Sequence, residues 1–177
     1  NGKGLVLKSM DDMWRFACAV RDSGCAPQSL NTPEKILIAL QTGAELGLLP
    51  MRALGSICVV KGQARLWGDT PLALVRQSGL MEYIKETIEG EGENMVATCE
   101  TKRKGDPEPI ITTFSVDDAK RAGLWNNKDK PTWKLYPQCM LKYRARSFNL
   151  RDNFPDCFGG ATIAEEFEGV EMPAEAI

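Results

Sequence analysis

The chain has 177 residues, of which 43% are hydrophobic, so it is long enough to bury the core of one domain. It contains no histidine, which removes the usual general base at neutral pH and excludes catalytic triads that depend on histidine. A P-loop, a GxGxxG motif and an HExxH motif are also lacking, so we expect neither nucleotide hydrolysis nor zinc proteolysis.

The formal net charge of −2 hides an uneven distribution. Residues 161–177 carry five Glu and no cation, whereas residues 1–160 carry 22 Lys or Arg against 19 acids. This asymmetry predicts a slightly basic domain over residues 1–158, followed by an acidic, flexible tail at residues 159–177. No stretch has the length and apolar character of a membrane span, and the six cysteines show no CxxC pair. We therefore expect a cytoplasmic protein with free thiols, no metal and no cofactor.

Capping residues and hydrophobic periodicity predict the elements of the first half of the chain. Helices are expected at residues 9–21 and 33–46, opened by Ser9 and Thr32 respectively. The pattern then changes to the period of a strand, and residues 56–67 are predicted to form a β-hairpin that turns at Lys61-Gly62-Gln63. A further helix follows the sequence Asp69-Thr70-Pro71 and ends at Ser78.

The second half continues with an acidic loop at residues 89–94 and a second pair of strands, residues 96–103 and 109–115. Ser115 and Asp118 have the spacing of a helix cap and predict a short helix that ends at Gly123. The order of elements indicates an α+β fold, in which a small antiparallel sheet of two hairpins packs with helices.

Charge and aromatic residues coincide between Lys120 and Arg151. This window holds nine Lys or Arg against one acid, Asp129, a local net charge of +8. It also holds five aromatic residues: Trp125, Trp133, Tyr136, Tyr143 and Phe148. Cations neutralise phosphates and aromatic faces accept unstacked bases, so the combination suits single-stranded nucleic acid. A solvated basic helix with aromatic residues in the core is the alternative interpretation.

Within this window, residues 137–151 are predicted to form a helix, with Pro137 at its first position and Pro155 beyond its end. At 100° per residue, Leu141, Ala145 and Phe148 form an apolar stripe. Cations fall on both sides of that stripe: Lys134, Lys142 and Arg146 on one side, Arg144 and Arg151 on the other. We expect the helix to pack by its stripe and to expose these cations.

The same segment resembles the signature of the RecT and Redβ (Bet) superfamily of phage single-strand annealing recombinases. The matching positions are Trp133, Pro137, Met140, Leu141, Lys142, Arg144, Arg151 and Phe154. The resemblance continues upstream through ALQTGAELGLLP, SICVVKGQARLWG and FSVDDAKRAGLW, and so covers most of residues 33–156. Arg146 has no dependable equivalent across the superfamily.

The resemblance implies a RecT/Redβ-like annealing domain, with a DNA groove between a small antiparallel sheet and helices. The implied function is ATP-independent binding of single-stranded DNA and annealing of complementary strands in phage-type homologous recombination, with no catalytic residues. The implied partners are single-stranded DNA, the annealed duplex, and further copies of the chain in a ring or helical filament. A phage exonuclease and a host single-strand-binding protein are further implied partners, in the cytoplasm of a bacterial host.

Nine cations are the candidate DNA contacts. The basic helix and its approach supply Lys134, Lys142, Arg144, Arg146 and Arg151, while the first hairpin and its neighbours supply Lys61, Arg65, Arg76 and Arg52. Removing the charges at Lys142 and Arg144 is expected to abolish annealing and to leave the fold unchanged.

Two other functions remain open from the sequence. A metal-dependent nuclease would use carboxylates among Asp69, Asp117, Asp118 and Asp129, although helix capping explains Asp118 and the helix dipole explains Asp117. A phage structural protein that oligomerises without DNA is the other alternative.

Overall fold

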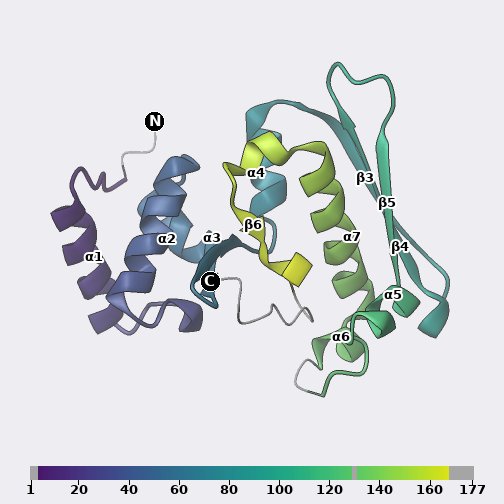
Figure 1. Cartoon of the computed structure of the whole chain (residues 1–177), viewed down its shortest axis with the longest axis horizontal. Coiled ribbons are helices and arrows are strands. Elements are labelled where there is room, and N and C mark those ends of the chain that lie inside the picture. Colours follow the sequence, from purple (N-terminus) through teal and green to yellow (C-terminus); the bar gives the residue numbers. More distant parts are fainter. Residues whose placement is uncertain (1–3, 129–130, 168–177) are drawn as a thin grey trace. The chain divides into compact units, whose positions relative to one another are not determined.

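The computed structural model describes residues 4–128 and 131–167 (Figure 1). Contacts between Cα atoms divide the chain into two compact units. The first unit runs to Leu74 and includes Asp156–Ala164, and the second contains Val75–Pro155 and the residues from Glu165 onward. The sequence suggested one domain over residues 1–158, followed by a tail whose residues 168–177 lie outside the described part.

Three helices form most of the first unit: α1 (Met10–Asp22), α2 (Pro33–Glu45) and α3 (Pro50–Ser56), with a 3-10 turn at Gln28–Leu30. The predicted caps of α1 and α2 are confirmed, since Ser9 accepts a hydrogen bond from the Asp12 amide and Thr32 accepts one from the Lys35 amide. Helices α2 and α3 pack so closely that a Cβ at Gly43 would lie 2.3 Å from the Ala53 Cβ. Glycine is therefore required at that crossing.

The predicted hairpin of the first unit is confirmed as β1 (Ile57–Val60) and β2 (Gln63–Leu66), which pair antiparallel. Lys61 and Gly62 form its two-residue turn with φ angles of 50° and 76°, as a type I′ turn needs. A short strand, β6 (Thr162–Ile163), pairs parallel with β2 and completes a three-stranded sheet. Part of the expected tail is therefore structured.

The predicted helix at residues 71–78 is confirmed as α4 (Thr70–Ser78), and the division between the units falls within it. The second unit is built on a sheet of β3 (Met81–Glu89), β4 (Val96–Arg103) and β5 (Ile110–Ser115), antiparallel with β4 in the centre. Strands β4 and β5 were predicted, and β3 was not.

Helix α7 (Pro137–Asn153) lies along one face of this sheet (Figure 1). Side chains of α5 (Val116–Arg121) and α6 (Thr132–Leu135) join it in one hydrophobic core. Alternation along β4 turns Ala97 and Cys99 toward that core, where they meet Phe114, Leu141 and Ala145. The second unit therefore has two layers, the sheet and the long helix packed on it.

The α+β class predicted from the sequence is confirmed. The sequence predicted one sheet of two hairpins, but the two hairpins lie in different sheets. Each sheet has a third strand, which is β6 beside the first hairpin and β3 beside the second. Short 3-10 turns at Gly92–Asn94, Pro155–Phe158 and Ala164–Phe167 complete the described part of the chain. None of the helices described in this structure is long and apolar enough to cross a membrane.

Candidate nucleic-acid interface

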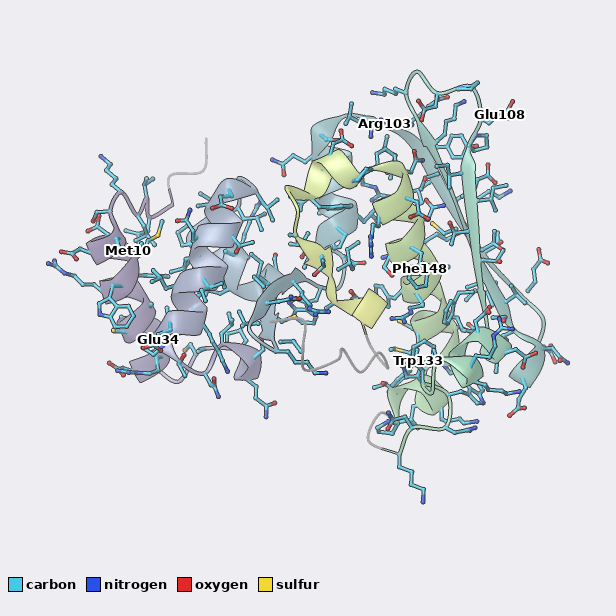
Figure 2. The ribbon with its side chains drawn as sticks, viewed as in Figure 1. Met10, Glu34, Arg103, Glu108, Trp133 and Phe148 are labelled. Carbon is cyan, nitrogen blue, oxygen red and sulfur yellow. The ribbon has the colours of Figure 1, made fainter. Side chains whose placement is uncertain are left out.

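One buried aromatic ring anchors the segment that leads into α7. Trp133 is 1% exposed, and its ring centre lies 6.3 Å from that of Phe114 on β5 (Figure 2). Pro137 then takes the first position of α7, where a helix has no use for the missing N–H. Between them, Leu135 and Tyr136 are each 66% exposed. The start of α7 is therefore fixed from inside and presents an aliphatic and an aromatic side chain to solvent.

An open groove of about 520 Å³ lies beside this exposed pair. Its volume falls within the range of about 300–1,000 Å³ that is usual for small-ligand sites. The lining is largely apolar, with one cation, and consists of Ile88, Met95, Leu135, Tyr136, Pro137, Gln138, Cys139 and Lys142. An aromatic face and apolar walls can receive a nucleobase, and an ammonium group beside them can neutralise a phosphate. The groove therefore offers the chemistry that binds a nucleotide of a single strand.

Lys134 lies one residue before the groove and belongs to a charged cluster. Its Nζ lies 4.2 Å from the centre of the Trp125 ring and 3.8 Å from Glu93 Oε1. The Glu93 carboxylate also accepts from Lys120 Nζ at 3.0 Å and from Trp125 Nε1 at 3.4 Å. These hydrogen bonds, led by that of Lys120, hold the pKa of Glu93 below its usual range. The positive charge of Lys134 is thus partly matched within the second unit.

The expectation that all cations of α7 are exposed is wrong for Arg144 and Arg146, which are only 4% and 7% exposed. Arg146 donates from Nε and Nη2 to the two carboxylate oxygens of Glu86 on β3, each at 2.8 Å. The Arg144 guanidinium lies 5.6 Å from the Phe114 ring centre and 5.1 Å from that of Phe148.

Both arginines can be buried because a guanidinium is planar and weakly hydrated. The guanidinium of Arg144 stacks on aromatic rings, and that of Arg146 pairs bidentately with a carboxylate. Neither reaches a phosphate without leaving its contacts. From its burial and ring contacts we now expect that loss of the Arg144 side chain destabilises the fold.

Two asparagines on the second half of α7 bind the sheet, and sequence reasoning missed both. Asn149 Nδ2 donates to the carbonyl oxygens of Cys99 and Ile110 at 2.9 Å, and Asn153 Nδ2 donates to Thr101 Oγ1 at 2.8 Å. Thr101 Oγ1 is in turn hydrogen-bonded to Asn149 Oδ1. The available signal was the spacing of the two asparagines, which lie four residues apart and so share one helix face. If that face is buried, each amide must find hydrogen bonds.

Arg103 of β4 binds the C-terminal end of α7 (Figure 2). Its Nη1 donates to the Asn153 carbonyl oxygen at 3.1 Å, and its guanidinium lies 5.6 Å from the Phe154 ring centre. An arginine near a helix C-terminus satisfies a carbonyl that has no partner within the helix and complements the helix dipole. The C-terminal half of α7 is therefore fixed to the sheet by polar contacts.

The remaining predicted DNA contacts are distributed over both units. Arg151 on α7 and Arg76 on α4 are exposed in the second unit, and Lys142 is half-buried at the groove. In the first unit, Lys61 at the hairpin turn and Arg52 on α3 are exposed.

Arg65, by contrast, is buried on β2, where its Nη2 donates to Gln63 Oε1 at 3.0 Å. Of the nine candidate cations, Lys142 alone lines the groove. Lys134 directly precedes Leu135, which is another lining residue.

Two of the four carboxylates considered for a nuclease, Asp117 and Asp118, pair with neighbouring side chains. Asp118 accepts from the Ser115 amide and hydroxyl and pairs with Arg121, which confirms the predicted capping box of α5. Asp117 pairs with Lys120 at 3.1 Å. Asp129 lies outside the described residues, and among the residues that are described no group of three or more His, Cys, Asp or Glu could hold a metal ion.

Comparison with known proteins identifies the family. The RecT family model matches residues 23–176, a range that contains the groove and the whole of α7. Searches of curated proteins and of solved structures give no match. The resemblance drawn from the signature residues is confirmed, and it associates the chain with single-strand annealing in DNA recombination. The chain belongs to the RecT family.

Proposed function

We propose that this protein binds single-stranded DNA and promotes the pairing of complementary strands, without ATP and without a covalent catalytic step. Membership of the RecT family is the observation that carries the proposal. The groove at the start of α7 supports it, because an exposed aromatic ring and a lysine line one apolar hollow. Both features suit a flexible strand whose bases are unstacked.

In this proposal the groove receives a base against Tyr136 while Lys142 binds the adjoining phosphate. Backbone contacts position a strand but carry no sequence information, so such a site accepts any sequence. An annealing protein must also leave most Watson–Crick edges accessible to the second strand. A site that holds one base in a pocket and contacts the rest of the strand through its phosphates meets that need.

Six of the nine candidate cations are proposed as phosphate contacts, since they are exposed or half-buried: Lys134, Lys142, Arg151, Arg76, Lys61 and Arg52. Arg65, Arg144 and Arg146 are assigned to the fold, because each is buried against groups of its own unit. Arg146 in particular would have to break its ion pair with Glu86 before it could bind a phosphate, and so would gain little from one.

Oligomers are a further part of the proposal. A few contacts in each copy become firm only when several copies bind the same strand, since the later contacts are intramolecular. A ring or helical filament would provide this, and an exonuclease that exposes single strands and a host single-strand-binding protein are the proposed companions.

Fluorescence anisotropy with a labelled oligothymidylate tests binding directly. Contact with about six phosphates predicts that log Kd changes with log salt concentration by a slope of about 4. Failure to bind at low salt by a folded protein would contradict the proposal. Cleavage of the oligonucleotide on addition of Mg²⁺ would instead favour the nuclease alternative.

A further inference from the structure

The charged cluster around Glu93 has the construction of an anion-binding site. Three donors from separate parts of the second unit converge on one carboxylate: Lys120 of α5 at 3.0 Å, Lys134 of α6 at 3.8 Å and the indole Nε1 of Trp125 at 3.4 Å. Trp125 is 5% exposed, so its N–H is held in place by packing. The Lys134 ammonium is also held above the indole ring, at 4.2 Å from its centre.

The carboxylate that occupies this site comes from the turn between β3 and β4. Glu93 lies in the short 3-10 turn Gly92–Asn94, and its side chain is 62% exposed. Gly90 and Gly92 have positive φ angles of 79° and 58°, which let the chain turn tightly at this point. Because the Glu93 side chain is exposed, a change of its rotamer alone would release Lys134 and Trp125 Nε1, while Lys120 would keep its ion pair with Asp117 at 3.1 Å.

We infer that Lys120, Lys134 and Trp125 Nε1 form a phosphate site of the DNA interface, and that Glu93 is an internal substitute which a DNA phosphate displaces. This inference rests on the proposed function and deepens it. Carboxylate and phosphate oxygens accept the same hydrogen bonds from ammonium and indole N–H groups. An ion pair between exposed side chains contributes little to stability, so exchange of one anion for another is easy.

The position of the site in the chain fits this role. Lys134 directly precedes Leu135, and Glu93 lies two residues before Met95; Leu135 and Met95 both line the groove. A strand with one phosphate at the Glu93 site can therefore place its neighbouring base toward the groove. The acid also screens two lysines while no DNA is bound, and so disfavours weaker anions.

The first test compares Glu93→Gln with Glu91→Gln, an exposed acid of the same turn, so that both variants change the net charge equally. Anisotropy of a labelled oligothymidylate measures the Kd. We expect Glu93→Gln to tighten binding about two- to fivefold, which corresponds to the loss of one exposed competing ion pair, and Glu91→Gln to have a smaller effect. Equal effects of the two variants, or weaker binding by Glu93→Gln, would overturn the inference.

A double variant identifies the lysine involved. If Glu93 competes for Lys134, the gain from Glu93→Gln shrinks when Lys134→Ala is also present, because the contested cation is gone. Lys120→Ala gives the same comparison for the other lysine, and a gain that neither Lys134→Ala nor Lys120→Ala diminishes would mean that Glu93 acts by general repulsion of DNA, which also overturns the inference.

A second measurement judges the anion site without DNA. The chain has four Trp, and loss of one indole N–H signal in Trp125→Phe assigns the resonance of Trp125. In Glu93→Gln, inorganic phosphate should shift this signal at lower concentrations than in the wild type and leave the other three in place. An unmoved Trp125 signal would overturn the site. Failure of oligothymidylate binding alone would instead sink the proposed function.

Discussion

Basic side chains have opposite roles at the start of α7 and further along it. At its start, Lys142 and Tyr136 line an open groove, and Tyr136 is largely exposed. Further along, Arg144 and Arg146 are buried against aromatic rings and a carboxylate. A basic helix is therefore not a DNA-binding surface along its whole length.

The difference follows from what faces each half. The second half lies along β3, β4 and β5, so its polar groups must find partners inside the unit. The first half begins beside α6, whose single anchor, Trp133, leaves the adjoining side chains in solvent. Burial by the sheet thus decides which cations are available to a ligand.

Thiol reactivity should show the largest difference between the exposed start of α7 and the sheet that the helix covers. Cys139 is exposed at the start of α7, whereas Cys99 is fully buried on β4, where burial raises its pKa to about 12. With that pKa only about one Cys99 in 10⁴ is a thiolate at a pH of about 8. Alkylation followed by mass spectrometry should label Cys139 at least about 100 times faster than Cys99. Comparable rates would mean that α7 does not stay packed on the sheet.

Breaking the buried ion pair should cost the most stability. Arg146→Met leaves the partly buried Glu86 carboxylate without its guanidinium, which we expect to lower the free energy of unfolding by about 3 kcal/mol in urea denaturation. The double variant Arg146→Met with Glu86→Met should recover much of the loss, and Arg151→Met, on the exposed side, should stay within about 0.5 kcal/mol of the wild type. An Arg146→Met protein as stable as the wild type would show that the pair does not hold the fold.

Removal of the Asn149 amide comes next. Asn149→Ala leaves the buried carbonyl oxygen of Cys99 and the part-buried carbonyl oxygen of Ile110 without this donor, so the free energy of unfolding should fall by about 2 kcal/mol. Asp152→Ala, an exposed position on the same helix, is the matched control and should change little. If both variants unfold at the same urea concentration, the amide contacts are not structural.

The smallest stability effect and a clear binding effect are expected at Tyr136. Tyr136→Ala removes an aromatic face worth about 1–3 kcal/mol per stacked base, so oligothymidylate binding should weaken about tenfold or more while the thermal midpoint stays unchanged. Tyr136→Phe keeps the ring and should bind like the wild type. Equal weakening by Ala and Phe would assign the role to the hydroxyl instead of stacking.

Local signals predicted much of the fold. The caps at Ser9, Thr32 and Ser115 placed three helices correctly, because a cap depends on residues three apart in the sequence. The hairpin at residues 56–67 followed from alternation and from a glycine in its turn.

Elements defined by distant contacts were not predictable in this way. Strand β3, with the sequence MEYIKETIE, has charged residues on both faces and is a strand through its pairing with β4. The two-residue strand β6 exists only beside β2. In the candidate site, the groove and the Glu93 cluster are made of residues from distant parts of the chain, between β3 and α7. The spacing of these residues in the sequence therefore could not predict that they lie together.

A strand-annealing assay tests the central claim most directly. Two complementary oligonucleotides are mixed with protein, without nucleotide or metal, and duplex formation is timed for the wild type and for Lys142→Gln with Tyr136→Ala. We predict that the wild type accelerates pairing and that the double variant, with an unchanged thermal midpoint, loses most of this acceleration. Full activity in the double variant, or none in the wild type, would contradict the assignment of the groove at the start of α7.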